Sequence, residues 1–406
     1  MFITVLPELI KQDKKTLAQI EQKATQFRKD AKSGGPQRTR AVRHARTLMK
    51  HAMKLNRAVM MFTDNALVGL VSRYDVFLSS ILKNAYRKNP GRATAPDRSL
   101  TYDELLTLES MDNVVELFIA KEIDNLLRES HQKQLEAIDR EFKIGIKEHF
   151  SEFPQLIEIM ERRNQLVHAD GIASKYYIKK CKEAGYKKEN LPDEGKKLYV
   201  SNDYFQASVL CVSELAVRLG YSLAFRVYPE KLDDIHDHLL GEVGFPLLSS
   251  DKWELSRRIY SFALSLPDKY APNDSCKRLY VINTALALNH LNRHDAALEL
   301  LDKYDWSTQG PRFLLAVAVL RHEWRKAEQI MSEMDGEKPF EEDHFRTWPV
   351  FKEFRNTKEF RRSYKAVYGK RFVSRLSKDE SDALKNVAKM EFSEQDASVY
   401  PNLRKL

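Results

Sequence analysis

Cysteine is scarce in this chain. Cys181, Cys211 and Cys276 are the only three, and no two of them form a C-x-x-C pair. Their spacing therefore indicates neither a disulfide framework nor a thiolate zinc site. We expect a protein of the reducing cytoplasm.

Glycine and proline are also infrequent, with 14 of each among 406 residues. Leucine, alanine, lysine and glutamate are spread evenly instead, and strand-like alternation of apolar and polar residues is scarce. This composition predicts an all-α protein. At this length the chain can build two or three domains with a sizeable core.

Several functional signatures are missing. No apolar run approaches the length of a membrane span, so we expect no membrane partner. The first ten residues show no basic leader and no cleavage-like small residues, which argues against a secretion signal. The absence of a Walker-type glycine loop, a dinucleotide fingerprint and a nucleophile elbow argues against ATP-driven, flavin or nicotinamide chemistry.

Positive charge, by contrast, is plentiful. The net charge of +9 and the pI of about 9.1 indicate an anionic partner without naming it. Residues 31–63 contain no Asp or Glu, and their basic residues recur at helical spacing, as in Arg43, Arg46, Lys50, Lys54 and Arg57. One interpretation is a helical stripe that binds RNA through Arg43, Arg46 and Lys50. The other is a solvated face, or a contact with an acidic patch of another subunit.

The most informative stretch is Glu161–Gly171, which reads ERRNQLVHADG. It lies at the end of a predicted amphipathic helix that begins at Phe153–Pro154, where proline suits the first turn. The helix is predicted to stop before Asp170–Gly171.

Three side chains at the end of this helix have the chemistry needed to cut RNA. Because imidazoles ionise near neutrality, His168 can take a proton from a ribose 2′-hydroxyl or return one to the leaving 5′-oxygen. Arg163 offers a planar fork of donors that can stabilise the charge developing on phosphorus, and Asn164 can orient the histidine or bind phosphate. The competing interpretation is a surface cation and a histidine that compensates the helix dipole.

The spacing of these residues raises a geometric problem. Asn164 and His168 are four residues apart and project in nearly the same direction. Arg163 and His168 are five residues apart, which separates them by roughly 140° around an ideal helix. We therefore expect a partner chain, or a loosened last turn, to bring the pair together.

The motif Arg-Asn-x-x-x-His at 163–168 resembles that of the HEPN superfamily, a group of helical bundles that includes many ribonuclease toxins and phage-defence nucleases. The resemblance extends over roughly residues 60–229, because predicted helices occur in the matching order at Ser72–Leu82, Asp112–Arg128, Gln132–Phe142 and Asp203–Phe225. It implies a metal-independent endoribonuclease that needs no cofactor, with Arg163, Asn164 and His168 as catalytic residues. It also implies a homodimer formed through the motif helix, and a role in growth arrest or phage defence.

An insertion at Tyr176–Lys197, longer and more basic than a simple connection, departs from the HEPN pattern. Its lysines alternate with tyrosines, so that cations can bind phosphates while bases stack on the rings. We assign RNA binding to the cations in and just before it, which are Lys175, Lys179, Lys180, Lys187 and Lys188. Arg162 is a further candidate for RNA contact, although the sequence does not fix its direction. The alternative is an ordinary lysine-rich surface loop.

Beyond Pro229 the pattern changes to short paired helices. We expect helices at Trp253–Leu266, Lys277–Leu291, Asp295–Tyr304, Pro311–Arg321 and Trp324–Met334. Two stretches, NRHDAALELLDKYD and HEWRKAEQIMSEMD, look like copies of one second helix and lie roughly thirty residues apart. They resemble tetratricopeptide-type hairpins, whose concave surface suits a protein regulator or trigger. The alternative is an irregular helical domain that only supports the bundle.

These observations predict three parts. They are an N-terminal helical arm with the basic stripe (residues 1–59), a HEPN-like ribonuclease bundle (60–229) and a helical-repeat-like C-terminal domain (230–406). The competing hypothesis is a non-catalytic helical scaffold, in which the same bundle binds RNA or mediates dimerisation and the repeats recruit a partner. A cleft that gathers Arg163 and His168 beside a basic surface would favour the nuclease, whereas His168 sealed in an apolar core would favour the scaffold.

Overall fold

The computed structural model describes residues 36–93, 110–333 and 342–373, together with Gln22, Thr25, Thr101 and Leu108. Within these residues the chain forms helices joined by short turns, and the one extended pairing is an isolated antiparallel bridge between Ile172 and Lys197. The prediction of an all-α protein is confirmed.

The chain divides into two compact units, Met1–Lys231 and Leu232–Leu406. The boundary expected after Pro229 lies two residues from this division. Most of the expected N-terminal arm, residues 1–35 except Gln22 and Thr25, lies outside the described residues.

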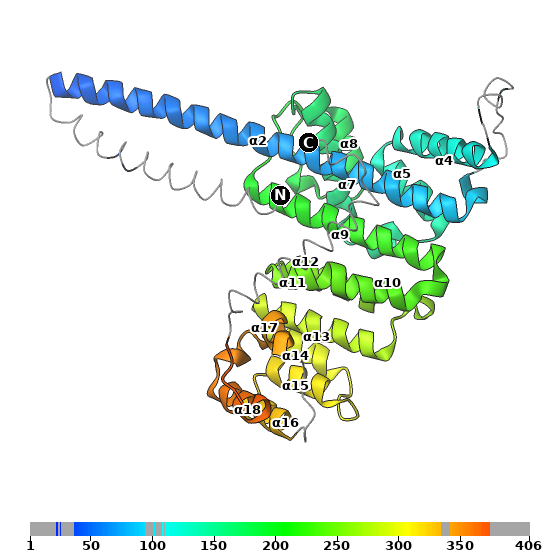
Figure 1. Ribbon diagram of the computed structural model, residues 1–406. Coiled ribbons are helices and arrows are strands. Elements are labelled where there is room, and N and C mark those ends of the chain that lie inside the picture. Colours follow the sequence, from blue (N-terminus) through cyan, green and yellow to red (C-terminus); the bar gives the residue numbers. More distant parts are fainter. Residues whose placement is uncertain are drawn as a thin grey trace. The chain divides into compact units, whose positions relative to one another are not determined.

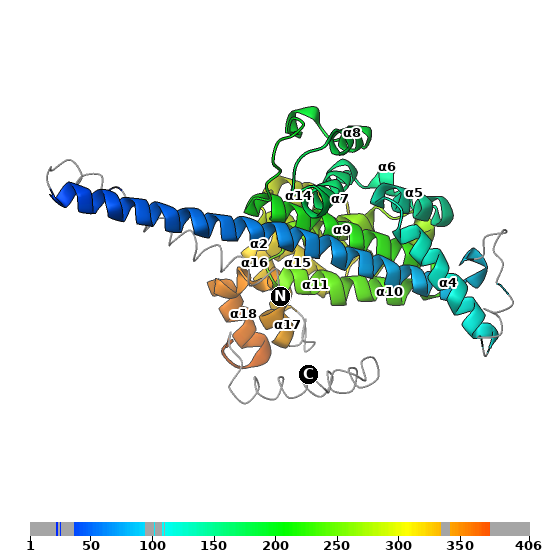
Figure 2. The same ribbon diagram turned by 90° about the horizontal axis from the view of Figure 1, so that it is seen from above.

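The expected division at residue 59 falls inside a continuous helix. Helix α2 runs from Pro36 to Lys88 without a break, 53 residues in all, which is roughly 80 Å at 1.5 Å per residue. No glycine or proline occurs between Pro36 and Gly69, so nothing in the sequence ends the helix there. The basic stripe and the first helix of the bundle are therefore one element, which extends beyond the bundle in Figures 1 and 2.

Unit 1 is a helical bundle built against the C-terminal half of α2. Leu67, Val71, Leu78 and Leu82 recur at helical spacing and are fully buried in its core, where α2 packs against α7 and α9. The helices of this unit that the sequence predicts after residue 110 begin and end within one or two residues of the observed ones, which is the ordinary uncertainty of helix ends. Apart from the insertion, the observed helices after α2 are α4 (Met111–Leu127), α5 (His131–Phe142), α6 (Ile146–His149), α7 (Phe153–His168) and α9 (Asn202–Val227), with 3-10 turns η1 (Pro90–Ala93) and η3 (Pro229–Lys231).

Helix α9 is long and apolar enough to cross a membrane by length and composition alone. Half of its most apolar stretch is buried inside the bundle, however, and core helices pass the same test. The property is weak evidence for a membrane span.

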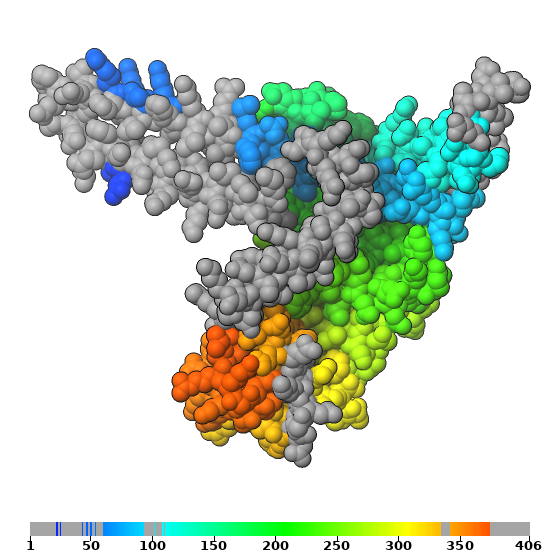
Figure 3. Space-filling model, in the orientation of Figure 1, coloured from blue at the N-terminus to red at the C-terminus, as the bar shows by residue number. Residues whose placement is uncertain are grey.

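The basic insertion is a folded subdomain. The Ile172–Lys197 bridge closes its base, and helix α8 (Lys175–Glu183) starts at Ser174, whose side chain accepts a hydrogen bond from the Tyr177 amide. A small core of its own holds α8 and the 3-10 turn η2 (Lys188–Asn190) in place, formed by Ala173, Tyr177, Cys181 and Leu198. Figure 2 shows α8 at the edge of the bundle near α7, and Figure 3 shows its green surface next to the blue of α2.

Unit 2 consists of short helices in sequential pairs, and the expected positions agree with those observed. In chain order they are α10 (Leu232–His238), the π-helical turn η4 (Leu239–Gly244), α11 (Phe245–Ser249), α12 (Trp253–Leu264), η5 (Asp268–Tyr270), α13 (Asp274–His290), α14 (His294–Asp302), α15 (Pro311–Leu320), α16 (Trp324–Ser332), α17 (Glu342–Thr347), η6 (Pro349–Phe351), η7 (Phe354–Asn356) and α18 (Lys358–Tyr368).

Two of these pairs, α13–α14 and α15–α16, have the same turn. Asn292 and His322, thirty positions apart, both have φ of 58°. The residue after each donates its amide to a carbonyl in the preceding helix, from Arg293 to Leu288 and from Glu323 to Ala318, both at 2.9 Å. The matching small residues Ala297 and Ala327 are both fully buried. The two hairpins are therefore copies of one structural unit.

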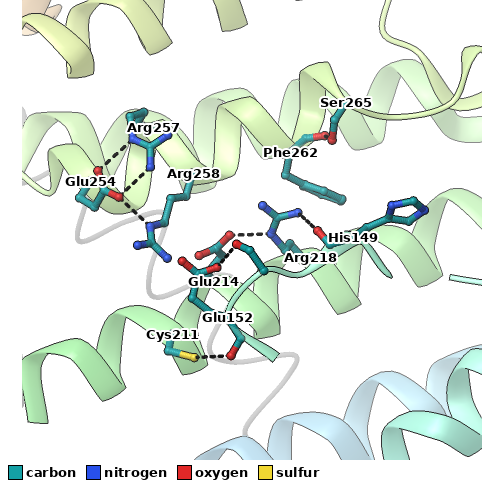
Figure 4. A network of polar contacts seen from close by, with 11 residues as sticks. His149, Glu152, Cys211, Glu214, Arg218, Glu254, Arg257, Arg258, Phe262 and Ser265 are labelled. Carbon is teal, nitrogen blue, oxygen red and sulfur yellow. Dashed lines mark hydrogen bonds and ion pairs between the residues drawn. The ribbon is translucent and has the colours of Figure 1, made fainter. Parts of the chain in front are cut away.

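Each unit contains a charged group paired within one helix, as Figure 4 shows. In unit 1, Arg218 pairs with the buried Glu214 at 2.7 Å within α9. In unit 2, Glu254 of α12 accepts hydrogen bonds from Arg257 and Arg258. Burial opposes the ionisation of Glu254, but the two guanidinium groups prevail and lower its pKa to about 2.

Candidate functional site

A cavity of about 470 Å³ in unit 1 gathers the three motif residues, Arg163, Asn164 and His168. Its volume falls within the range of small-molecule binding sites. Its other walls come from the middle of α2, from the turn between α4 and α5, and from the start of α8, which contribute Asp75, Arg128, His131 and Tyr176 among others. The motif residues therefore line one cavity, and none of them is sealed in an apolar core.

Arg163 reaches this cavity within a single chain. Glu161, Gln165 and His168 share one face of α7, and Arg163 starts from another. Its long side chain nonetheless lines the same space, because its Nη1 donates to Asn164 Oδ1 at 3.2 Å and its Nη2 lies 3.7 Å from Asp75 Oδ2. Since α7 stays helical through His168, both residues line the cavity without a loosened last turn. The angle calculated from the sequence concerned the Cβ directions, whereas the guanidinium group lies several bonds further out.

Asp75 connects three elements at the cavity wall. One of its oxygens lies 2.9 Å from His131 Nε2 at the start of α5, and the other faces Arg163 of α7. Its side chain is 29% exposed and that of His131 is 11% exposed, so this contact is only partly screened by water. His168, by contrast, is exposed.

Several polar atoms at the cavity lack a partner in the described structure. They are Arg163 Nε, Gln165 Oε1 and Gln134 Oε1, all buried. Buried polar atoms are normally paired, so groups left without a partner next to a cavity indicate a polar occupant or water. Such a lining suits a phosphate and its sugar better than an apolar ligand.

Glu161 is an acid inside this wall. Burial raises the pKa of its carboxyl group, although the charge of His131, a hydrogen bond with Asn164 and the charge of Lys180 act in the opposite direction. The residue is 6% exposed. A carboxyl group that resists ionisation repels a bound phosphate less than an ordinary glutamate would.

Arg162 points away from the cavity into the protein. Its Nε donates to Glu158 Oε1 at 2.8 Å, its Nη1 donates to the Tyr199 carbonyl, and its guanidinium lies 4.1 Å from the centre of the Tyr204 ring. Its side chain is 11% exposed. The direction that the sequence left open is therefore inward, and Arg162 does not belong to the surface on which we place RNA.

The lysines of the insertion lie on its surface. Lys175 and Lys179 are 85% and 72% exposed, and Lys187 and Lys188 are exposed as well. Lys180 is 29% exposed and donates to Glu183. Of the tyrosines expected among these cations, Tyr176 is 57% exposed and lines the cavity itself, whereas Tyr186 is half-buried. Tyr177 is fully buried, so the expectation that it stacks on RNA bases is wrong.

The basic residues of α2 form a separate surface. Arg43, Arg46 and Lys50 are exposed on this helix, whereas the side chains of Lys54 and Arg57 lie outside the described part. Lys50 precedes Asp75 by 25 residues in the same helix, which is roughly 40 Å. These cations can contact a long nucleic acid at a distance from the cavity and are not part of its wall.

Sequence reasoning missed two residues of the cavity, His131 and Asp75. The Ser130–His131 start of α5 indicates a helix N-terminus, and Ser130 does cap it by accepting from the Lys133 amide. Nothing in the spacing connects this turn to Asp75, 56 residues earlier, or to α7. Only the packing of α2, α5 and α7 reveals the pair.

Other groups of potential ligands serve the core. In the cluster Asp233–His238, His236 is buried and lies within hydrogen-bond distance of the Tyr280 hydroxyl and the Tyr270 carbonyl. Across the described residues, no group of three or more His, Cys, Asp or Glu side chains is arranged to hold a metal ion.

Comparison with known proteins adds no assignment. The chain matches no protein family, no curated protein and no solved structure. The function has to be argued from the cavity.

The two adjacent arginines should behave differently on substitution. We expect Arg162→Ala to lower the free energy of unfolding by about 3–5 kcal/mol, because it leaves Glu158 as an unpaired buried charge. Arg163→Ala should cost less than about 1 kcal/mol, because its contact with Asp75 is long and partly solvated. Urea denaturation followed by circular dichroism measures both, and equal losses would contradict the inward assignment of Arg162.

The raised pKa of Glu161 gives a pH dependence of stability. Ionising this group costs the folded state more than the unfolded one, so the penalty grows as the pH rises through the folded pKa and disappears below the ordinary value of 4.5. Glu161→Gln should therefore raise the melting temperature near about pH 8 and have little effect near about pH 4. The exposed Glu148→Gln is the control, and a gain for Glu161→Gln that is largest in acid would have the wrong sign.

Proposed function

We propose that this protein is a metal-independent endoribonuclease of the HEPN type. The observation that carries the proposal is the single cavity lined by Arg163, Asn164 and His168 together. Each has the role that its chemistry allows: acid–base transfer for His168, charge stabilisation for Arg163 and positioning for Asn164, which already holds the Arg163 guanidinium.

The reaction follows from these groups. His168 takes the proton of a ribose 2′-hydroxyl, and the 2′-oxygen attacks the adjacent phosphorus. Negative charge gathers on the non-bridging oxygens, where the fixed positive charge of Arg163 stabilises it. The bond from phosphorus to the 5′-oxygen breaks with its electron pair on that oxygen, which takes up a proton and leaves as a 5′-hydroxyl. The other product carries a 2′,3′-cyclic phosphate. No step requires a bound metal ion, and DNA lacks the nucleophile.

The surroundings of the cavity favour single-stranded RNA. Tyr176 offers an exposed ring at the cavity, on which a base next to the scissile phosphate can stack. Lys179, Lys187 and Lys188 extend a cationic surface from there over the insertion. A base and its phosphates are thus recognised by one folded subdomain.

In this proposal each chain carries a complete site. A homodimer formed through the motif helix, where Val167 is 47% exposed, would then hold two sites without sharing residues. The resemblance to HEPN proteins adds a role in growth arrest or phage defence, with the paired hairpins of unit 2 as the element that senses a regulator.

The first functional prediction concerns catalysis. His168→Ala should reduce RNA cleavage by a factor of about 10² to 10⁴, the usual contribution of a positioned acid–base group. Arg163→Ala should cost about 10² to 10³. Purified protein is incubated with single-stranded RNA in EDTA, and the products are examined for 2′,3′-cyclic phosphate ends.

Three outcomes would contradict this mechanism. Cleavage that stops in EDTA would require a metal, and cleavage that survives His168→Ala would require another base. RNA binding without any cleavage would favour the scaffold hypothesis.

Mixing Arg163→Ala chains with His168→Ala chains should restore no activity, because recovery would place the site between two chains.

A second prediction separates binding from chemistry. Replacing Lys179, Lys187 and Lys188 by glutamine should weaken RNA binding and flatten its dependence on salt. With a loss of roughly 0.7 per phosphate contact, the slope of log K against log salt should fall by up to about 2. The rate at saturating RNA should change little, since these side chains are not part of the reacting group.

A matched variant of α2 provides the control. Replacing Arg43, Arg46 and Lys50 by glutamine removes the same charge at a distance from the cavity. If this variant lowers the salt slope and the insertion variant does not, the RNA follows α2 and the assignment to the insertion is wrong.

A further inference from the structure

The cavity contains a second histidine that the motif does not include. His131 is the first residue of α5, directly after the N-cap Ser130. Its ring packs against the buried Tyr74, with 6.3 Å between ring centroids, and its Nε2 lies 2.9 Å from Asp75. Together with Arg163 and His168 it lines the same 470 Å³ cavity. Two imidazoles and one guanidinium thus face a common space.

We propose that His131 is the second proton-transfer group, which protonates the leaving 5′-oxygen while His168 deprotonates the 2′-hydroxyl. This inference rests on the proposed function, since it assigns a role within the same reaction.

Cleavage needs both transfers. The 2′-oxygen gives its proton to His168 and forms a bond to phosphorus, and the bond from phosphorus to the 5′-oxygen breaks with its electron pair on that oxygen. An alkoxide is a poor leaving group, so a donor that supplies a proton as the bond breaks accelerates this half of the reaction. A single histidine would have to move between the two oxygens, whereas two histidines can act on them at once. The atoms and charges balance without any further reactant.

The surroundings of His131 suit a proton donor. Its Nε2 lies 2.9 Å from Asp75 Oδ1, so the carboxyl group can hold the ring in place while the ring gives up a proton. His168 lies at the exposed end of α7 instead. The His131 ring contacts Tyr74 and Asp75 of α2. The other charged and titratable groups that line the cavity with it are Arg128 and Glu129 before α5, Glu161, Arg163 and His168 of α7, and Tyr176 of α8.

Asp75 is then a positioning residue. By holding Nε2 it fixes the ring and its tautomer, and leaves Nδ1 as the nitrogen for the substrate. Its second oxygen faces Arg163, so one carboxylate orients the proton donor and the phosphate ligand together. Asp75→Asn should lower kcat by a larger factor than it raises KM, because it disturbs the orientation of His131 and Arg163 while the exposed ring of Tyr176 and the lysines of the insertion remain.

The test compares two substrates that differ only in the leaving group. One is a dinucleotide whose leaving group is a 5′-ribose hydroxyl. The other is a uridine 3′-phosphate ester of p-nitrophenol, which leaves without a proton. We expect His131→Ala to lose a factor of about 10² to 10⁴ on the dinucleotide and less than about tenfold on the nitrophenyl ester. His168→Ala should lose a comparable factor on both, because both need the base.

The controls separate this inference from the proposed function. His149→Ala removes an exposed histidine outside the cavity and should be neutral. His131→Gln keeps a donor for Asp75 and should show the same selective loss if His131→Ala fails to fold. Equal losses of a His131 variant on both substrates, or no loss, would overturn the assignment while leaving His168 in place. An inactive parent protein would overturn the proposed function itself.

Discussion

The buried carboxylate of Glu158 is the interaction on which the site in unit 1 depends. It lies one turn before Arg162 in α7, and it also accepts hydrogen bonds from the hydroxyls of Tyr177 in α8 and Tyr204 in α9, at 2.5 and 2.6 Å. A charge with no exposure is tolerated only when it is paired and hydrogen-bonded in this way. Because the partners come from three elements, α7 cannot rotate or slide without breaking the group. The direction of its last turn, and with it the position of the motif, is fixed from inside.

This constraint explains how two neighbouring arginines take opposite roles. Arg162 pairs with the buried carboxylate and lies over the Tyr204 ring of α9, whereas the next position on the helix starts from a different face. Arg163 accordingly lies at the cavity, where Asp75 and Asn164 hold its guanidinium while Nε keeps no partner. The same carboxylate holds α8 through Tyr177. Tyr176, which directly precedes Tyr177 in α8, therefore lies at the cavity in a fixed position. The interior network thus positions both the Arg163 guanidinium and the Tyr176 ring at the cavity.

The sequence allowed most of the helices to be predicted, because they follow from apolar spacing and from capping residues. The continuity of α2 was also present in the sequence, in the lack of any glycine or proline between Pro36 and Gly69, but the start of the HEPN resemblance near residue 60 was mistaken for a domain boundary. Helix α8 had a signal too, the N-cap Ser174 followed by the buried Tyr177 and Cys181 four residues apart. The partners in the cavity had none. Asp75 and His131 meet only through tertiary packing, and the 140° that separates Arg163 from His168 on an ideal helix takes no account of how far an arginine reaches.

The location of the two histidines at helix ends has a physical reason. His131 begins α5 and His168 ends α7, so each side chain faces the cavity while the backbone behind it is held by the core. In α5 the buried Leu135 is one turn further along, and in α7 the buried Gln165 is one turn back. Catalytic groups must be held to within a fraction of an ångström and still be accessible, which loops achieve poorly and helix centres rarely allow. Two helix ends that converge on one cavity satisfy both requirements. Asp75, on a third helix, contacts both sides of the cavity. One of its oxygens holds the His131 ring, and the other faces the Arg163 guanidinium.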